Sequence, residues 1–145
     1  GGTLFTSRPL STPEVISDLS IYTVPANTLN SLQDRLEIYS PGVFTESYGG
    51  GKRLILEIYN TKVIDLSVES GDNSSWLVKS TVYLWTSPAS PVYDLMVWTG
   101  GLLYSMVVST ALSGLTSSDN TIRFRGQSGV TQYATFIDYR PANSQ

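Results

Sequence analysis

Six acidic residues lie on or beside stretches in which apolar and polar residues alternate: Glu37, Glu57, Asp65, Glu69, Asp94 and Asp138. Two carboxyl groups flanking a glycosidic bond are the catalytic pair of most glycoside hydrolases. The stretches around Glu37 and Glu57, however, also carry Arg35 and Arg53 on the same face of the expected strand. Cross-strand ion pairs on a solvated face explain these residues more simply. We therefore predict no catalytic residue and no enzyme activity.

A polar segment, Asp72-Asn73-Ser74, offers oxygen atoms of the kind that bind calcium. It lacks the alternating acidic pattern of a dedicated calcium loop, so a surface turn is the favoured interpretation and calcium the alternative. The run Gly49-Gly50-Gly51 could cradle a phosphate only if a helix followed it, and a strand is expected from Lys52 onward. We expect a hairpin loop there, and we predict no metal and no cofactor.

Aromatic side chains are the best candidates for binding. The chain contains nine Tyr and three Trp, and several alternate with apolar residues along the expected strands. Aromatic rings on a sheet can stack on sugar rings, and Tyr is favoured at protein interfaces. Packing in the core or in a subunit contact is the alternative role for these rings. The residues predicted to contact a ligand or an interface are Tyr39, Tyr59, Tyr83, Trp85, Trp98 and Tyr104.

Residue types that the chain lacks exclude several kinds of chemistry. It has no His and no Cys, which excludes a Ser-His-Asp triad, a thiol nucleophile, a disulfide and a Cys-based zinc site. The formal net charge is −3, and no run of Lys and Arg is longer than Lys52-Arg53. We therefore expect neither nucleic acid nor an anionic membrane as a partner. The longest mostly apolar run, 102–112, is too short to span a bilayer.

The elements that must position these residues are predicted to be strands. Residues favoured in strands, many of them alternating apolar and polar, occupy 20–24, 35–40, 52–59, 62–68, 76–86, 92–98, 102–110, 121–125 and 130–140. Pro41-Gly42 and Asn60-Thr61 are predicted turns between them. One helical turn is expected at 14–19, with Thr12 as its cap.

This rhythm predicts an all-β fold. Strands without crossover helices pair antiparallel, so we expect a jelly-roll-like β-sandwich of about eight to nine strands. At 145 residues the chain is long enough for a single hydrophobic core. The predicted divisions are an N-terminal arm and connector at 1–19, the sandwich at 20–140 and a tail at 141–145.

Residues 18–85 resemble a domain pattern of bacteriophage virion proteins such as head fibres and tail fibres. The pattern runs from a strand through Pro-Ala-Asn-Thr-Leu, Asp-x-Leu-x-Ile, Gly-x-Phe and Lys-x-Leu-x-Leu to a strand that opens with Trp. The matching residues are Leu19, Tyr22, Pro25, Ala26, Asn27, Thr28, Leu29, Asp34, Leu36, Ile38, Gly42, Phe44, Lys52, Leu54, Leu56 and Trp76. Gln33 stands where the pattern usually has Gly, and Asn60-Thr61 where it usually has Gly-Gly.

The resemblance implies a non-enzymatic structural domain at the virion surface, as a fibre or a capsid decoration, usually trimeric. Its partners would be further copies, other virion proteins and a host-surface glycan or protein. Asn27 and Asp34 would hold turns through bonds to the backbone, and Trp76 would anchor the core. A monomeric carbohydrate-binding module or lectin-like domain is the alternative, because jelly rolls host both functions. The protruding domain of a eukaryotic virus capsid is a third hypothesis.

Overall fold

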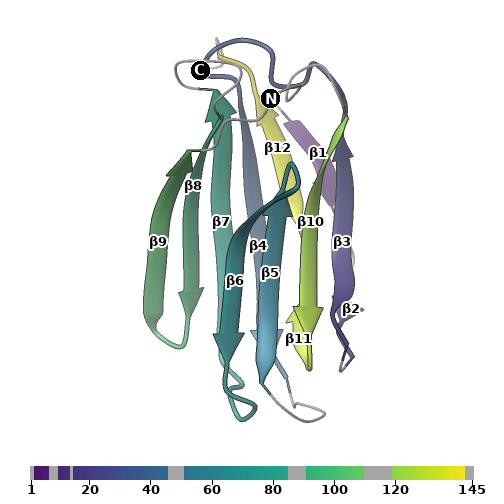
Figure 1. The fold of residues 1–145 in the computed structure, drawn as a ribbon, viewed down its shortest axis with the longest axis vertical. Helices are drawn as coiled ribbons and strands as arrows, with labels where there is room; N and C mark the ends of the chain where they lie inside the picture. The colour runs from purple at the N-terminus through teal and green to yellow at the C-terminus, as the bar shows by residue number, and fades with distance from the viewer. Residues whose placement is uncertain are drawn as a thin grey trace.

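The structure is a computed structural model that describes residues 2–6, 10–13, 15–45, 51–84, 91–109 and 119–142. The regular structure of these residues consists of strands (Figure 1). No helix in them is long and apolar enough to cross a membrane. The helical turn predicted at 14–19 is wrong, because β3 already begins at Ser17. Thr12, the expected cap, instead accepts a hydrogen bond from the Val130 backbone N–H at 3.0 Å.

Two antiparallel sheets contain all the described strands. The large sheet consists of β1 (Gly2–Thr6), β2 (Leu10–Ser11), β4 (Arg35–Phe44), β7 (Ser75–Leu84), β8 (Pro91–Thr99), β9 (Leu102–Ser109), β11 (Val130–Gln132) and β12 (Phe136–Arg140). The small sheet consists of β3 (Ser17–Val24), β5 (Lys52–Ile58), β6 (Thr61–Val68) and β10 (Asn120–Gln127). Their orders are β1-β12-β4-β7-β8-β9, with β11 and β2 beside β4, and β3-β10-β5-β6.

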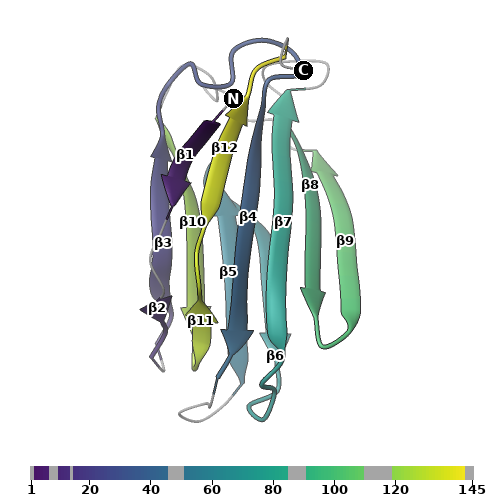
Figure 2. The same cartoon turned by 180° about the vertical axis from the view of Figure 1, so that it is seen from behind.

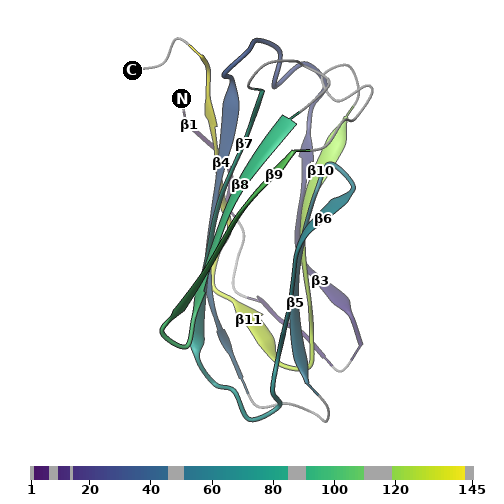
Figure 3. The same cartoon turned by 60° about the vertical axis from the view of Figure 1, so that its left-hand side comes forward.

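The sheets pack face to face as two layers (Figure 3), which confirms the predicted antiparallel β-sandwich. The chain crosses between the layers after β2, β3, β4, β6, β9 and β10. The described strands number twelve, more than predicted, and β1, β2 and β11 are among the shortest. The strand predicted at 130–140 is in fact two, β11 and β12. The division into arm, sandwich and tail stays a prediction.

The core lies between the sheets and follows the period of two. In β7 the buried face carries Trp76, Val78 and Val82, while alternate residues point outward. Trp76 is only 2% exposed, and its ring lies 6.4 Å from that of Phe44 at 43°. The role of Trp76 as a core anchor is therefore confirmed.

The β5–β6 hairpin turns through Tyr59 and Asn60, one residue earlier than predicted. Both have positive φ, 51° and 62°, as a type I′ hairpin requires. Gln33 also has positive φ, at 71°. Gln33 and Asn60 both stand where the phage pattern usually has glycine, and this is the conformation that glycine adopts most readily.

The turn predicted at Pro41-Gly42 is wrong, because β4 continues through both residues to Phe44. The Pro41 carbonyl accepts a hydrogen bond from Tyr133, between β11 and β12. Proline has no backbone N–H to donate, and Pro41 lies where the neighbouring strand is interrupted, so its missing donor is tolerated there. Only glycine fits at position 42 in this packing, because a Cβ there would lie 2.1 Å from the Trp76 ring and 2.2 Å from the Thr131 carbonyl oxygen.

Candidate functional site

The outer face of the large sheet, which faces the viewer in Figure 2, carries an exposed aromatic pair. Tyr39 of β4 lies opposite Phe136 of β12 on one side and opposite Lys79 of β7 on the other. The Tyr39 and Phe136 rings are 6.0 Å apart at 51°, and the two residues are 42% and 37% exposed. In this tilted arrangement the two rings contact each other, while part of each ring remains exposed and could contact a ligand.

A shallow hollow of about 460 Å³ surrounds the aromatic pair. We call it the aromatic hollow, and the outward side chains that line it are Glu37, Tyr39, Lys79, Thr81, Phe136 and Asp138. It therefore combines two aromatic rings with a hydroxyl, an ammonium and two carboxylates. A flat apolar surface beside polar groups of both hydrogen-bonding kinds is the composition expected of a polar-ligand site.

The carboxylates of the aromatic hollow differ in their surroundings. Glu37 accepts from the Arg35 side chain at 3.2 Å and lies 3.7 Å from the Arg140 side chain. The ion-pair interpretation of Glu37 is therefore confirmed. Asp138 lies directly opposite Glu37 on β12. Within the described part of the chain, neither Asp138 nor Lys79 forms an ion pair.

A second depression lies beside the aromatic hollow on the same face. It measures about 310 Å³ and is lined by Gln33, Arg35, Thr81, Tyr83 and Asp94. Thr81 belongs to both depressions. The two hollows therefore adjoin at Thr81, on the outer face of β4 and β7.

Asp34 fixes the strands that carry the aromatic pair. Its buried carboxylate accepts from the backbone N–H groups of Asn30, Ser31 and Ala142 at 3.1, 2.8 and 2.8 Å. Burial alone would raise the pKa of Asp34, but these bonds and one from Tyr139 outweigh it and hold the pKa below its usual value. The start of β4 is thereby joined to the chain that leaves β12, as the turn-holding role predicted.

The structure separates the six aromatic residues predicted as contacts. Tyr39 is exposed in the aromatic hollow, and Tyr83 lines the adjacent depression. Trp98 is half-buried on the outer face, whereas Tyr104 is 49% exposed at the free edge of the same sheet. Tyr59 is a core residue, 2% exposed, because the hairpin turns it inward; Trp85 lies outside the described residues. Ligand contact stays a prediction for the exposed members of the set.

Phe136 is the residue that sequence reasoning missed. Its strand was predicted, and Phe136, Asp138 and Arg140 alternate along it. Nothing in that alternation says that Phe136 pairs with Tyr39, because the register joins strands from opposite ends of the chain. The alternation alone could have placed Phe136 on the same face as Asp138, but not beside Tyr39.

The calcium alternative at Asp72 is not supported by the geometry. The Asp72 carboxylate accepts the Ser74 backbone N–H at 2.8 Å, which closes a turn, and the buried Lys52 ammonium donates to the Asp72 carbonyl. Hydrogen bonds from the backbone and side chain of Ser74 hold the pKa of the Asp72 carboxyl below its usual value. No group of three acidic residues placed to hold a metal ion occurs among the described residues. The Gly49-Gly50 part of the predicted loop lies outside them.

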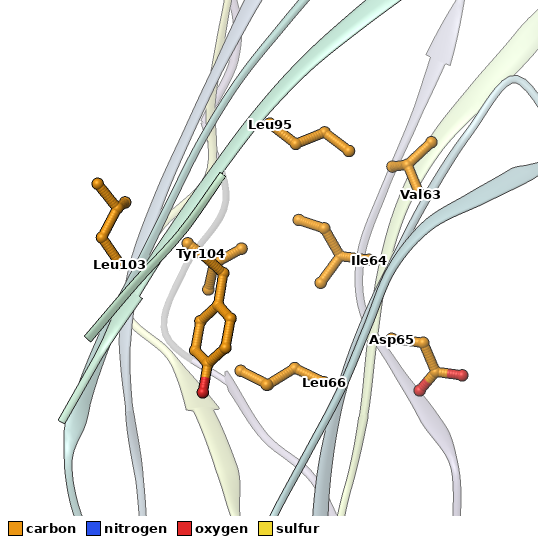
Figure 4. A pocket seen from close by; sticks show the side chains of 8 residues that line it. Val63, Ile64, Asp65, Leu66, Leu95, Leu103 and Tyr104 are labelled. Atoms are coloured by element: carbon orange, nitrogen blue, oxygen red, sulfur yellow. The ribbon is translucent and has the colours of Figure 1, made fainter. Parts of the chain in front are cut away.

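A separate, apolar groove opens at the free edge between the sheets (Figure 4). We call it the edge groove; its volume is about 480 Å³. Val63, Ile64 and Leu66 of β6 form one wall, and Leu95, Val97 and Tyr104 of β8 and β9 form the other. Its inward-facing lining is apolar apart from the Tyr104 hydroxyl, because the Asp65 carboxylate points away from it (Figure 4) and pairs with Arg53. The edge groove therefore differs in kind from the aromatic hollow.

Comparisons with known proteins give a distant likeness of fold. No protein-family model and no curated protein matches the chain. Among solved structures it is similar to the CBM2 module of the evolved Dit of Lactobacillus casei BL23 phage J-1, at 12% sequence identity and a TM-score of 0.41. The match covers 81% of this chain and 66% of that one, so the chain spans slightly under two thirds of that structure. The likeness is too distant to indicate a ligand or a function.

Proposed function

We propose that this chain is a non-enzymatic structural domain of a virion surface that attaches to a host-surface glycan through the outer face of its large sheet. The observation that carries the glycan-binding part is the exposed Tyr39–Phe136 pair, with ring centroids 6.0 Å apart. The sequence resemblance to phage fibre proteins supports the virion location. Further copies and other virion proteins would hold the domain on the particle.

The chemistry of the aromatic hollow favours a sugar over a purely apolar ligand. The apolar face of a pyranose ring can lie on Tyr39 or Phe136, while its hydroxyl groups reach Asp138, Lys79 and Thr81. Each of these three side chains can accept or donate a hydrogen bond without a change in the fold. Because the two hollows adjoin at Thr81, an oligosaccharide could reach both, whereas a monosaccharide would occupy one.

The test is glycan-array binding of the whole chain, followed by titration of the best glycan. We expect Tyr39→Ala to weaken binding by about tenfold or more, the usual effect of truncating a central aromatic anchor. Tyr39→Phe keeps the ring and should retain most of the affinity. Leu32→Ala is the matched control, because Leu32 is 46% exposed and lies outside both hollows.

Two outcomes would contradict the glycan-binding proposal. One is the absence of any binding to the array by well-folded protein. The other is binding that Tyr39→Ala and Phe136→Ala both leave unchanged while the melting temperature also stays unchanged. In the second case the ligand would occupy another surface of the sandwich.

The same face would equally serve a monomeric carbohydrate-binding module or lectin-like domain. The exposed ring pair favours this second candidate as directly as the first, because glycan contact needs only one copy of the hollow. The two candidates differ in assembly. A virion appendage is built from several copies, whereas a lectin-like module would bind its glycan as a monomer.

A further inference from the structure

Strand β9 is the last strand of the large sheet in the part of the chain that the structure describes. In the described part of the chain β9 pairs with β8 alone, so its other row of backbone N–H and C=O groups faces away from the sheet (Figure 1). Three consecutive large apolar residues begin this strand: Leu102, Leu103 and Tyr104 are 60%, 54% and 49% exposed. A long apolar edge of this kind is a template for pairing with another strand.

The charges on this side of the sandwich also permit self-association. All eight residues of β9 are uncharged. The facing edge strand β6 carries Lys62 and Asp65, which are already joined at 3.2 Å, and Asp65 also binds Arg53 at 2.6 Å. Two copies that meet here therefore bring no unpaired like charges together, although the whole chain has a net charge of −3.

The edge groove supplies the apolar surface that such a contact would cover. Leu102 and Tyr104 lie opposite Thr99 and Val97, which are buried on the inner face of β8, so both point to the inner side of β9. Tyr104 stands at the mouth of the edge groove (Figure 4). A strand added beside β9 would place its own inner side chains over that mouth.

We propose that a second copy of this chain occupies this edge, with the two β9 strands paired antiparallel across a two-fold axis. Antiparallel pairing of a strand with itself is self-complementary, because each backbone bond is repeated by its symmetry mate. The two large sheets join into one continuous sheet. Leu102 and Tyr104 of each copy close the mouth of the other copy's edge groove.

This arrangement differs from the trimer that the phage resemblance implies. A two-fold contact closes at two copies and leaves no equivalent edge for a third. It also leaves the aromatic hollow free, since Tyr39 and Phe136 lie on β4 and β12, away from β9 in the strand order. The proposal is therefore independent of glycan binding, and each can fail without the other.

The first test is the molar mass of the whole chain in solution, by light scattering on a sizing column over a range of concentrations. We expect a dimer that dissociates on dilution. Tyr104→Lys adds an inward-pointing charge to the edge, the device by which natural sheets prevent edge pairing. It should raise the dissociation constant by at least about tenfold, whereas Leu32→Lys, which adds the same charge at an exposed site elsewhere, should not.

Hydrogen exchange supplies a second readout that does not depend on a variant. In the dimer the amides of β9 that face away from β8 should exchange more slowly at high protein concentration than at low concentration. A monomer at all concentrations, or a trimer whose mass Tyr104→Lys leaves unchanged, would overturn the proposal. So would a dimer in which exchange along β9 does not depend on concentration.

Discussion

The two outer faces of the sandwich share one alternating pattern and differ in what that pattern leaves unpaired. On the small sheet four ion pairs at 2.6–3.4 Å join neighbouring strands: Asp18–Arg123, Asp18–Arg125, Glu57–Arg125 and Arg53–Asp65. A fifth, Lys62–Asp65 at 3.2 Å, lies within β6. On the large sheet the ion pairs found among the described residues are those of Glu37 with Arg35 and Arg140. The exposed Tyr39–Phe136 pair lies next to Glu37 on the same face.

The difference lies in how many donors and acceptors remain without a partner on each face, rather than in the number of polar groups. A ligand can gain only from groups that are not already paired. An ion-paired face offers few free donors or acceptors, and each exposed pair contributes little stability. A face with exposed rings and free charged groups can gain more from a ligand. Glu57, one of the candidate carboxylates, shows the principle, because it pairs at 3.3 Å with Arg125 of the neighbouring strand rather than with Arg53 of its own strand.

The largest expected effect comes from the core that supports both faces. We expect Trp76→Ala to lower the free energy of unfolding by about 3–5 kcal/mol, because it leaves a cavity beneath Gly42 and Phe44. Urea denaturation measures the loss. Trp98→Ala, at a half-buried position on the outer face, is the matched control and should cost clearly less. Equal losses at the two positions would contradict the assignment of Trp76 as the core anchor.

The second-largest expected effect distinguishes the outer face of the large sheet from that of the small sheet. Asp34→Ala should cost about 2 kcal/mol, because three backbone N–H groups lose a charged acceptor. It should also weaken glycan binding, since Asp34 joins the start of β4 to the end of β12. Unfolding and glycan titration of the same variant measure both effects. Asp18→Ala, on the small sheet, should leave glycan affinity unchanged and serves as the control.

The pH dependence of the Asp34 contribution follows from its lowered pKa. Because the folded-state pKa lies below the unfolded value, the stabilisation is complete above the ordinary carboxyl pKa and is lost as the pH falls through the lowered one. Unfolding measured on the acid side should therefore show a loss of stability that Asp34→Asn removes. A variant with an unchanged acid profile would show that Asp34 is not a source of that loss.

The smallest effect belongs to the ion-paired face. Hydrogen bonding to Arg53, with a further bond from Lys62, lowers the pKa of Asp65 to about 2. Its contribution is present above the ordinary value of 3.8 and is lost as the pH falls from there toward 2. Because the site is exposed, we expect at most about 1 kcal/mol. Asp65→Asn should remove this step without changing glycan affinity; a change in affinity would mean that the two faces are coupled.

Much of the fold could be predicted from particular residues. The alternation of Leu36 and Ile38 with Arg35, Glu37 and Tyr39 predicted a strand and the face that is buried, and the structure confirms both. Pro41-Gly42 could not be predicted correctly, because a local turn signal was overridden by an interruption in the neighbouring strand and by the Trp76 ring.

The sequence by itself determined which residues share a strand face, because successive side chains in a strand point to opposite sides. Only the tertiary structure decided which strands are neighbours. The pairing of β12 with β4 brings Phe136 beside Tyr39, and the β5–β6 turn withdraws Tyr59 into the core. Such pairings join distant segments and are selected by packing of the whole core. No local pattern in this chain encodes them.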